Sequence, residues 1–213
     1  MRNDLILKNF ICGQLATNCY IFGAPSLHEK DIKEIVIIDP AGNSSEIINY
    51  IDANELVPKM ILITHGHIDH VADIYPIKDH YAIDVAIHKA DALYLDNPDP
   101  FIQQIMGGDY YPVTPDRFLD DNDTIEIGTS TIQVIHTPGH TPGGICLLVD
   151  SLLFTGDTLF AAGIGRTDFP GGDYGALKNS ITTKLWPLPD DLTILPGHGP
   201  KSKLGMEKKR AFW

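Results

Sequence analysis

The stretch Ile63-Thr-His-Gly-His-Ile-Asp-His-Val71 places four side chains that can bind a metal ion within six residues. An apolar strand is predicted immediately before it. Alternate residues of an extended chain face the same way, so His65 and His67 can reach one ion. If the chain then turns into a helix, Asp69 and His70 point at a neighbouring position. Imidazole and carboxylate ligands together suit zinc, manganese or iron.

Three later segments repeat this arrangement, in which an apolar strand ends in a ligand next to glycine. They are Thr131–His140, Ser151–Asp157 and Leu192–His198, and the last residue of each is a candidate metal ligand. Glycines before each ligand permit the sharp, positive-φ backbone that carries a side chain over a sheet edge. One such segment is a weak signal. Four of them, all at predicted strand ends, indicate one metal centre built from five histidines and two aspartates.

Around these segments the sequence predicts an α/β fold. Its second half repeats the order of the first: strands come first, and a mixture of strands and helices follows. Strands are predicted near residues 5–10, 19–22, 34–39, 60–64, 84–88, 124–127, 131–136, 144–149, 152–155 and 192–195. Helices are predicted near residues 44–56, 71–81, 90–95 and 175–185. No linker divides the chain, so we expect a single domain over residues 1–213. Its expected architecture is a four-layered sandwich of two facing sheets with helices outside.

The composition restricts the partners. The 213 residues carry a formal charge of −12, from 28 acidic and 16 basic residues, so nucleic acid is not an expected partner. No stretch approaches the ~20 apolar residues of a membrane span, and residues 1–10 lack a signal-peptide pattern. We therefore expect a cytoplasmic protein with no membrane partner. The three cysteines lack C-x-x-C spacing, which argues against a disulfide framework or a thiolate zinc site.

The order of ligands, His-x-His-x-Asp-His followed by His, Asp and His, resembles that of the metallo-β-lactamase superfamily from about residue 10 to residue 200. The resemblance implies an αββα sandwich with a metal site along one edge of the two sheets. It implies two divalent metal ions as cofactors. Zinc is the expected metal, and iron and manganese are alternatives. It also implies a role for each candidate ligand: the first ion is held by His65, His67 and His140, the second by Asp69, His70 and His198, and both by a bridging Asp157.

Three stretches, Thr137–Gly144, Gly165–Gly172 and Pro196–Pro200, resemble the bacterial glyoxalase II-like (hydroxyacylglutathione hydrolase-like) branch. That branch implies that a metal-bridging hydroxide hydrolyses a small-molecule thioester of the S-lactoylglutathione type. Asp69 is then the catalytic residue that orients the water. The β-lactamases of this fold have a cysteine or serine where this chain has Asp157, so antibiotic hydrolysis is not expected.

The chain departs from full-length glyoxalase II at the thiol-binding side. Only 15 residues follow His198, where that family has a helical domain that contacts glutathione. The glutathione-binding loop is replaced by Arg166-Thr-Asp-Phe169, so the thiol carrier stays open. Arg166 either binds a substrate carboxylate or pairs with Asp168 and braces the ligand loops, and we favour bracing. His136 is expected to support a ligand, because His140 occupies the turn.

Other proteins of this fold are alternatives. One is a persulfide dioxygenase, which has one iron held by two histidines and an aspartate. This chain resembles such enzymes in its first ligand motif and in Arg166–Phe169. The ending Pro196–Pro200 resembles the hydrolase branch instead and keeps His198. A lactonase would have the same ligands and a different pocket. The negative charge argues against an RNA-processing nuclease, and the presence of all seven ligands argues against a non-catalytic binding module. The long loop Asn97–Pro115 is predicted to be a functional lid or a binding loop.

Overall fold

The buried strand that precedes the histidine cluster belongs to a six-stranded sheet, in a computed structural model that describes residues 4–29, 31–96 and 110–211. In spatial order its strands are β1 (Ile6–Cys12), β2 (Thr17–Pro25), β3 (Lys33–Ile38), β4 (Leu56–Leu62), β5 (Asp84–His88) and β6 (Arg117–Leu119). The first three strands pair antiparallel, and β3 to β6 pair parallel. The carboxyl ends of the parallel strands therefore meet at one edge, where ligand-bearing loops can gather.

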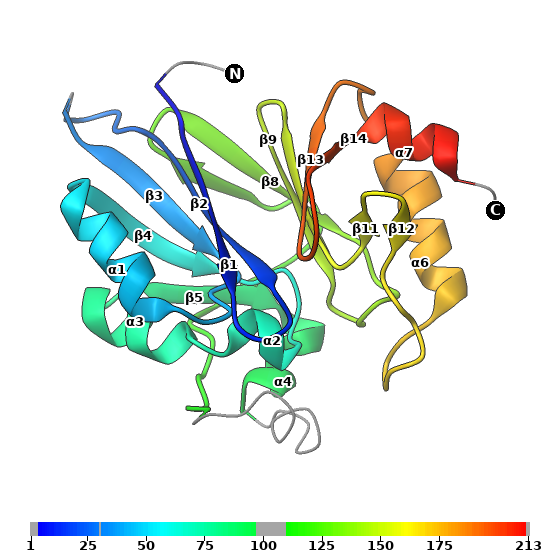
Figure 1. The fold of residues 1–213 in the computed structure, drawn as a ribbon, viewed down its shortest axis with the longest axis horizontal. Coiled ribbons are helices and arrows are strands. Elements are labelled where there is room, and N and C mark those ends of the chain that lie inside the picture. Colours follow the sequence, from blue (N-terminus) through cyan, green and yellow to red (C-terminus); the bar gives the residue numbers. More distant parts are fainter. Residues whose placement is uncertain (1–3, 30, 97–109, 212–213) are drawn as a thin grey trace.

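A second six-stranded sheet packs against the first (Figure 1). In spatial order its strands are β14 (Ser202–Lys203), β13 (Thr193–Pro196), β10 (Leu152–Gly156), β9 (Ile145–Val149), β8 (Ser130–His136) and β7 (Thr124–Ile127). Only the β10–β13 pair in this sheet is parallel. A separate hairpin, β11 (Leu159–Phe160) and β12 (Gly163–Ile164), follows β10.

Helices cover the outer face of each sheet. Figure 1 shows α1 and α3 outside the first sheet and α6 and α7 outside the second. The helical segments are α1 (Ser44–Ala53), α2 (Ile68–Val71), α3 (Ile74–Tyr81), the 3-10 turn η1 (Lys89–Asp91), α4 (Ala92–Asp96), α6 (Tyr174–Ser180), the π-helical turn η2 (Ile181–Leu185) and α7 (Leu204–Arg210). Within the described ranges no helix has the length and apolar character needed to cross a bilayer.

Three apolar clusters separate these four layers. Along β3, Ile35 and Ile37 pack toward the helices, whereas Val36 and Ile38 pack between the sheets. Successive side chains of a strand point to opposite faces, so a strand covered on both sides reads as a continuous apolar run. A third cluster lies between the second sheet and α6, around Leu177. The predicted αββα sandwich is confirmed.

Several element boundaries differ from the sequence-based expectation. The single helix predicted over residues 71–81 is divided, because Asp73 leaves the helix: its N–H donates to Pro40 O (2.9 Å) and its carboxylate accepts from Ser44 N (2.7 Å). Helix α1 stops before Glu55, which has a φ of 52°. The short strands β6, β11, β12 and β14 and helix α7 were not predicted. Residues 97–109 of the predicted loop lie outside the described residues.

The last helix is tied to the β11–β12 hairpin by a buried carboxylate. Glu207 of α7 accepts a hydrogen bond from the backbone N–H of Ala162 (2.7 Å), one of the two residues between the short strands. It also accepts from Ser202 and from Arg210. The position of the hairpin therefore depends on α7.

Phe154 generates a stability prediction, because it fills the space between the sheets. It is 1% exposed and makes edge contacts with Tyr20 (ring centroids 5.3 Å apart) and Phe22 (6.1 Å). We expect Phe154→Ala to lower the free energy of unfolding by about 3–5 kcal/mol, measured by urea denaturation. The control Phe118→Ala, at a side chain that is 56% exposed, should change it by no more than about 0.5 kcal/mol. Equal losses in the two variants would contradict this account of the core.

Candidate metal centre

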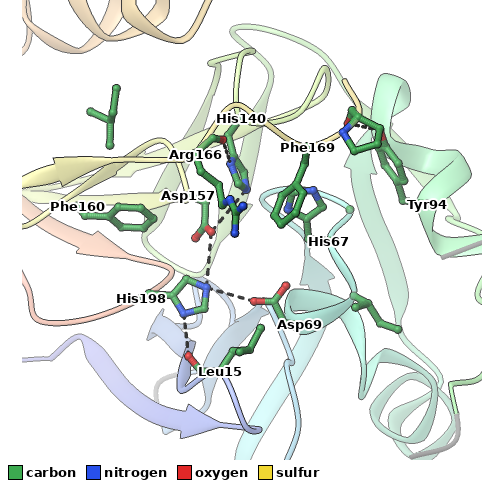
Figure 2. A pocket seen from close by; sticks show the side chains of 14 residues that line it. Leu15, His67, Asp69, Tyr94, His140, Asp157, Phe160, Arg166, Phe169 and His198 are labelled. Carbon is green, nitrogen blue, oxygen red and sulfur yellow. Dashed lines mark hydrogen bonds and ion pairs between the residues drawn. The ribbon is translucent and has the colours of Figure 1, made fainter. Parts of the chain in front are cut away.

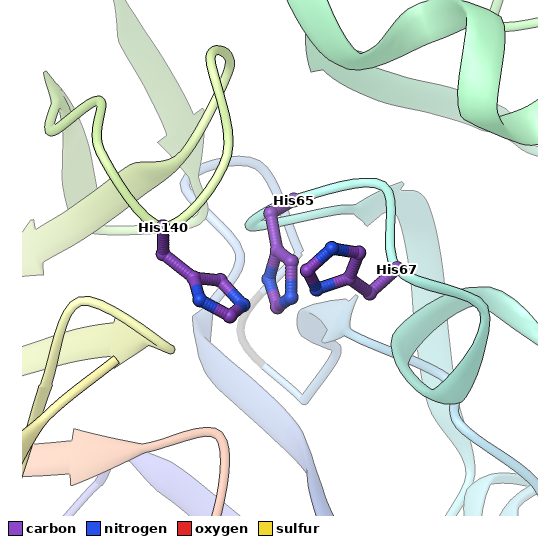
Figure 3. Close-up of side chains that lie close together, drawn as sticks. All are labelled: His65, His67 and His140. Atoms are coloured by element: carbon purple, nitrogen blue, oxygen red, sulfur yellow. The ribbon is translucent and has the colours of Figure 1, made fainter. Parts of the chain in front are cut away.

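The seven candidate ligands converge at the edge where strands of both sheets end. His65 and His67 follow β4, and Asp69 and His70 lie in α2. His140 follows β8, Asp157 follows β10 and His198 follows β13. In the tri-histidine group (His65, His67 and His140) one nitrogen of each ring lies within 4.8 Å of the others (Figure 3). The same limit holds for one ligand atom each in the mixed group (Asp69, His70 and His198).

Asp157 lies between the two groups. Its Oδ1 is 3.4 Å from His70 Nε2, and its Oδ2 is 3.5 Å from His140 Nε2 and 3.6 Å from His198 Nε2. The carboxylate therefore faces members of both groups at once. Neither ligand group contains a cysteine, so the donor set is imidazole nitrogen and carboxylate oxygen, which suits zinc, iron or manganese.

Backbone carbonyls orient two of the imidazoles. His140 Nδ1 lies 2.7 Å from the carbonyl oxygen of Arg166, and His198 Nδ1 lies 3.1 Å from that of Leu15. A carbonyl oxygen can only accept, so each ring donates from Nδ1 and leaves the Nε2 lone pair of its neutral form directed into the cluster. Second contacts of this kind are what hold a metal-binding histidine in one tautomer and orientation.

A buried aspartate that the sequence analysis missed orients two more imidazole rings. Asp39, at the end of β3, is 2% exposed and accepts from Thr64 N (2.7 Å), Thr64 Oγ1 (2.6 Å) and His70 Nδ1 (2.9 Å). Because the Thr64 hydroxyl donates to Asp39, its lone pair is free to accept from His65 Nδ1 (3.2 Å). The available signal was a carboxylate at the end of the apolar run Ile35–Ile38.

The cluster fits a bound cation, as unpaired buried atoms show. Within the described part of the chain, three side-chain atoms are buried with no hydrogen-bond partner, namely His65 Nε2, His140 Nε2 and Asp157 Oδ1. In addition, His70 Nε2 and His198 Nε2 face each other 3.3 Å apart, although each ring already donates from Nδ1. Two neutral rings would oppose lone pairs there. Divalent ions would satisfy these atoms together.

The pKa shifts separate the two groups. Burial, followed by the charges of neighbouring histidines, lowers the pKa of His65 well below its ordinary value, and burial lowers the pKa of His67 to about 4. Burial opposes the charged form of His70 and His198, but nearby aspartates raise the pKa of both rings. Burial likewise opposes ionisation of Asp69, but His70 and His198 hold the pKa of its carboxyl below the ordinary value.

Glycines let the ligand loops approach one another. Gly156, before Asp157, has a φ of +45°, and a Cβ there would lie 2.4 Å from Thr64 Oγ1. Gly139, before His140, also has a positive φ. Gly197, before His198, has an ordinary φ; a Cβ there would lie 2.2 Å from Asp157 Oδ1. At Gly197 close approach, rather than the predicted positive φ, explains the glycine.

The remaining candidate residues take different places. Arg166 and Asp168 are exposed and form a two-bond pair, with Nε–Oδ1 at 2.8 Å and Nη2–Oδ2 at 2.7 Å. The contact from this loop to a ligand comes from the Arg166 carbonyl, not its side chain. His136 Nε2 lies 3.0 Å from Pro142 O, in the loop that carries His140. In the described part of the predicted loop, the Tyr110 hydroxyl donates to Leu95 O and Tyr111 stacks on Tyr75.

A cavity of about 650 Å³ opens beside both groups. Figure 2 shows Phe160 beside His198, and Phe169 and Tyr94 beside His67. The ring centroids of Phe160 and His198 are 6.3 Å apart, and those of Phe169 and His67 are 5.7 Å apart. The guanidinium carbon of Arg166 lies 3.9 Å from the Phe169 ring centroid. The cavity therefore combines apolar walls with a floor of candidate ligands, the arrangement expected of a small-molecule site.

The sequence profile of the metallo-beta-lactamase superfamily matches residues 12–198, a range that includes all seven candidate ligands. The chain belongs to the metallo-β-lactamase superfamily. Members of this superfamily bind divalent metals, in agreement with the histidine and aspartate groups described above. Hydroxyacylglutathione hydrolase GloC of Haemophilus influenzae is 38% identical over 188 residues, which cover 86% of this chain and 89% of that protein.

Solved structures of the superfamily include two that are similar over nearly their whole length. The crystal structure of the BLEG-1 B3 metallo-β-lactamase has a TM-score of 0.83 and 34% identity, and the match covers 96% of this chain and 97% of that one. The crystal structure of TTHA1623 in a di-iron-bound form has a TM-score of 0.82 and 30% identity, with 95% and 98% covered. One such relative thus holds two iron ions.

The pKa shifts predict that acid removes one ion before the other. In the metal-free protein the raised pKa values of His70 and His198 favour a proton where the ion must bind, so affinity at the mixed group falls as the pH falls. His65 and His67 have lowered pKa values and are neutral already, so the tri-histidine group keeps its ion. We expect dialysis in metal buffers at pH 8, 7 and 6, followed by elemental analysis, to show stepwise loss.

His198→Ala supplies the control for this titration. It removes a member of the mixed group, so the acid-labile ion should be absent at every pH while the other ion stays. Simultaneous loss of both ions from the unmodified protein would contradict the separation of the two groups.

Proposed function

We propose that this protein is a two-metal hydrolase that cleaves thioesters of the S-lactoylglutathione type. The observation that supports this most is Asp157, whose carboxylate faces the tri-histidine group through His140 and the mixed group through His70 and His198. In this proposal His65, His67 and His140 hold one ion, Asp69, His70 and His198 hold the other, and Asp157 contacts both. Two divalent ions held by neighbouring groups of ligands would form the kind of centre that hydrolases of many substrates share.

The reaction requires a nucleophilic water and a polarised carbonyl. Divalent ions bound at these groups would supply Lewis acidity and lower the pKa of a water to about 7. The chain itself orients the reactants. Asp69 lines the cavity, stays ionised, and is held by the Thr17 hydroxyl (3.3 Å), so its carboxylate is placed to accept a proton of the attacking water. The water oxygen forms a bond to the carbonyl carbon, the C–S bond breaks, and the departing sulfur takes that bond's electron pair and the proton that Asp69 accepted.

The acyl and thiol parts of the substrate would lie against the apolar walls. Phe160 flanks the mixed group and Phe169 the tri-histidine group, so an aromatic ring lies on each side of the candidate ligands. The similarity to hydroxyacylglutathione hydrolase GloC supports a glutathione thioester as substrate. The Arg166 side chain is paired with Asp168, in accordance with the bracing role that we favour for this loop.

Metal analysis and a substrate comparison test the proposal. We expect close to two ions of zinc, iron or manganese per chain in the purified protein, measured by elemental analysis. We expect the protein to hydrolyse S-D-lactoylglutathione, and the loss of thioester absorbance measures this reaction. A chromogenic cephalosporin should be assayed in parallel, because the BLEG-1 B3 metallo-β-lactamase is 34% identical. One iron per chain with no hydrolysis of any thioester would favour persulfide oxygenation and defeat the proposal.

Asp69→Ala tests the role of the carboxylate that faces the cavity. We expect turnover to fall about 100-fold or more, since the variant loses both a ligand and the acceptor for the water, while circular dichroism and the melting temperature stay near those of the parent. Asp79→Ala is the matched control, because it removes an exposed carboxylate of α3 that does not line the cavity, and it should leave turnover unchanged. Near-normal turnover of Asp69→Ala would exclude the role.

A further inference from the structure

A buried carboxylate that the reaction does not use joins the two loops of the tri-histidine group. Asp91, in η1, is 0% exposed. Its Oδ2 accepts from the backbone N–H of Gly66 (2.9 Å) and from the hydroxyl of Thr141 (2.7 Å). Its Oδ1 accepts from the backbone N–H of Gly143 (2.6 Å). Gly66 lies between His65 and His67, whereas Thr141 and Gly143 follow His140.

The two loops come from different sheets and meet on the same short segment. A Cβ at Gly143 would lie 2.6 Å from Asp91 Oδ1, and one at Gly66 would lie 2.6 Å from Tyr94 Cβ. Neither position therefore has room for a side chain. In the same segment His88 stacks on His136, with ring centroids 4.0 Å apart and planes 10° apart. Residues 88–94 thus contact both loops.

The three contacts on Asp91 all require an acceptor. A carboxylate is acceptor-only when ionised, and two of its three partners are backbone N–H groups, which can only donate. The loops are also joined by the bond from Ile145 N to Thr64 O (2.9 Å), but that bond lies at their base. The Asp91 bonds lie next to the ligands themselves, at the residue between two histidines and at the residue after the third.

We propose that Asp91 is a positioning residue that sets the separation of the His65–His67 loop and the His140 loop, and so adapts the tri-histidine group to its ion. This rests on the proposed function only in requiring that the tri-histidine group binds a metal ion. The mixed group makes no contact with Asp91, so its affinity should be independent of this carboxylate. Positioning thus acts on one ion of the pair.

Asp91→Asn tests the positioning role, because the amide has nearly the same size and shape as the carboxylate. Whichever way the amide is turned, its NH₂ faces a backbone N–H, of Gly66 or of Gly143, and leaves that donor without an acceptor. Loss of such an outer contact weakens metal binding about 10- to 100-fold. We expect that loss for one of the two ions only, measured by zinc titration against a chelator, and a changed visible spectrum of the cobalt-substituted protein.

Reference variants identify which ion is affected. Asp91→Asn should resemble His67→Ala, which removes a member of the tri-histidine group, and differ from His198→Ala. Asp116→Asn is the matched control: it alters a carboxylate that accepts from a backbone N–H, that of Val85 (2.8 Å), away from both groups, and should leave both affinities unchanged. Thr141→Val removes one donor while Asp91 stays, and should give a smaller loss in the same direction, which keeps the test open if Asp91→Asn folds poorly.

Two results would overturn the inference. One is binding of both ions to Asp91→Asn with the parent's affinities. The other is equal weakening at the two groups together with a lower melting temperature, which would make Asp91 a general stabiliser. The proposed function fails separately: a parent protein that binds two ions but hydrolyses no thioester would leave the positioning role of Asp91 standing.

Discussion

The hydrogen bonds received by Asp39 are the interaction on which the metal centre depends. This carboxylate sits where β3 ends, with a φ of +52°, and takes three donors from the neighbouring β4 loop and from α2. One side chain thereby joins two parallel strands at their ends and determines which nitrogen of His65 and of His70 points inward. The rest of the cluster is arranged around those two rings.

The surrounding fold makes so costly a cluster tolerable. Five imidazoles and two carboxylates are crowded at the floor of the cavity, and their unpaired buried atoms would favour separation if the backbone allowed it. Each ligand follows a strand that is buried on one or both faces, so separation would require the three apolar layers to open. The sheets fix the strand ends from which the candidate ligands project, which reduces the reorganisation that ion binding costs.

The sequence predicted what depends on local pattern and failed where distant contacts decide. The continuous run Glu34–Ile38 predicted a buried strand, and the candidate ligands after the strands stood out because metal-binding residue types are conspicuous there. Asp39 and Asp91 carry the same chemical group as many surface acids, and only the tertiary structure shows what they accept. The break at Asp73 depends on bonds to Pro40 and Ser44, some 30 residues earlier. No local pattern encodes such contacts.

Ligands and cavity walls have separate origins in this fold. The candidate ligands lie at the ends of sheet strands or in the helix that follows one, whereas Leu15, Phe160 and Phe169 come from a hairpin turn, a two-residue strand and a loop. The Phe160 wall is itself held by α7 through Glu207. Descendants of such a chain can exchange walls by short insertions or deletions and keep the metal chemistry intact. Divergence in substrate range is then easier than divergence in reaction type, and grafted loops offer a direct route to new selectivity.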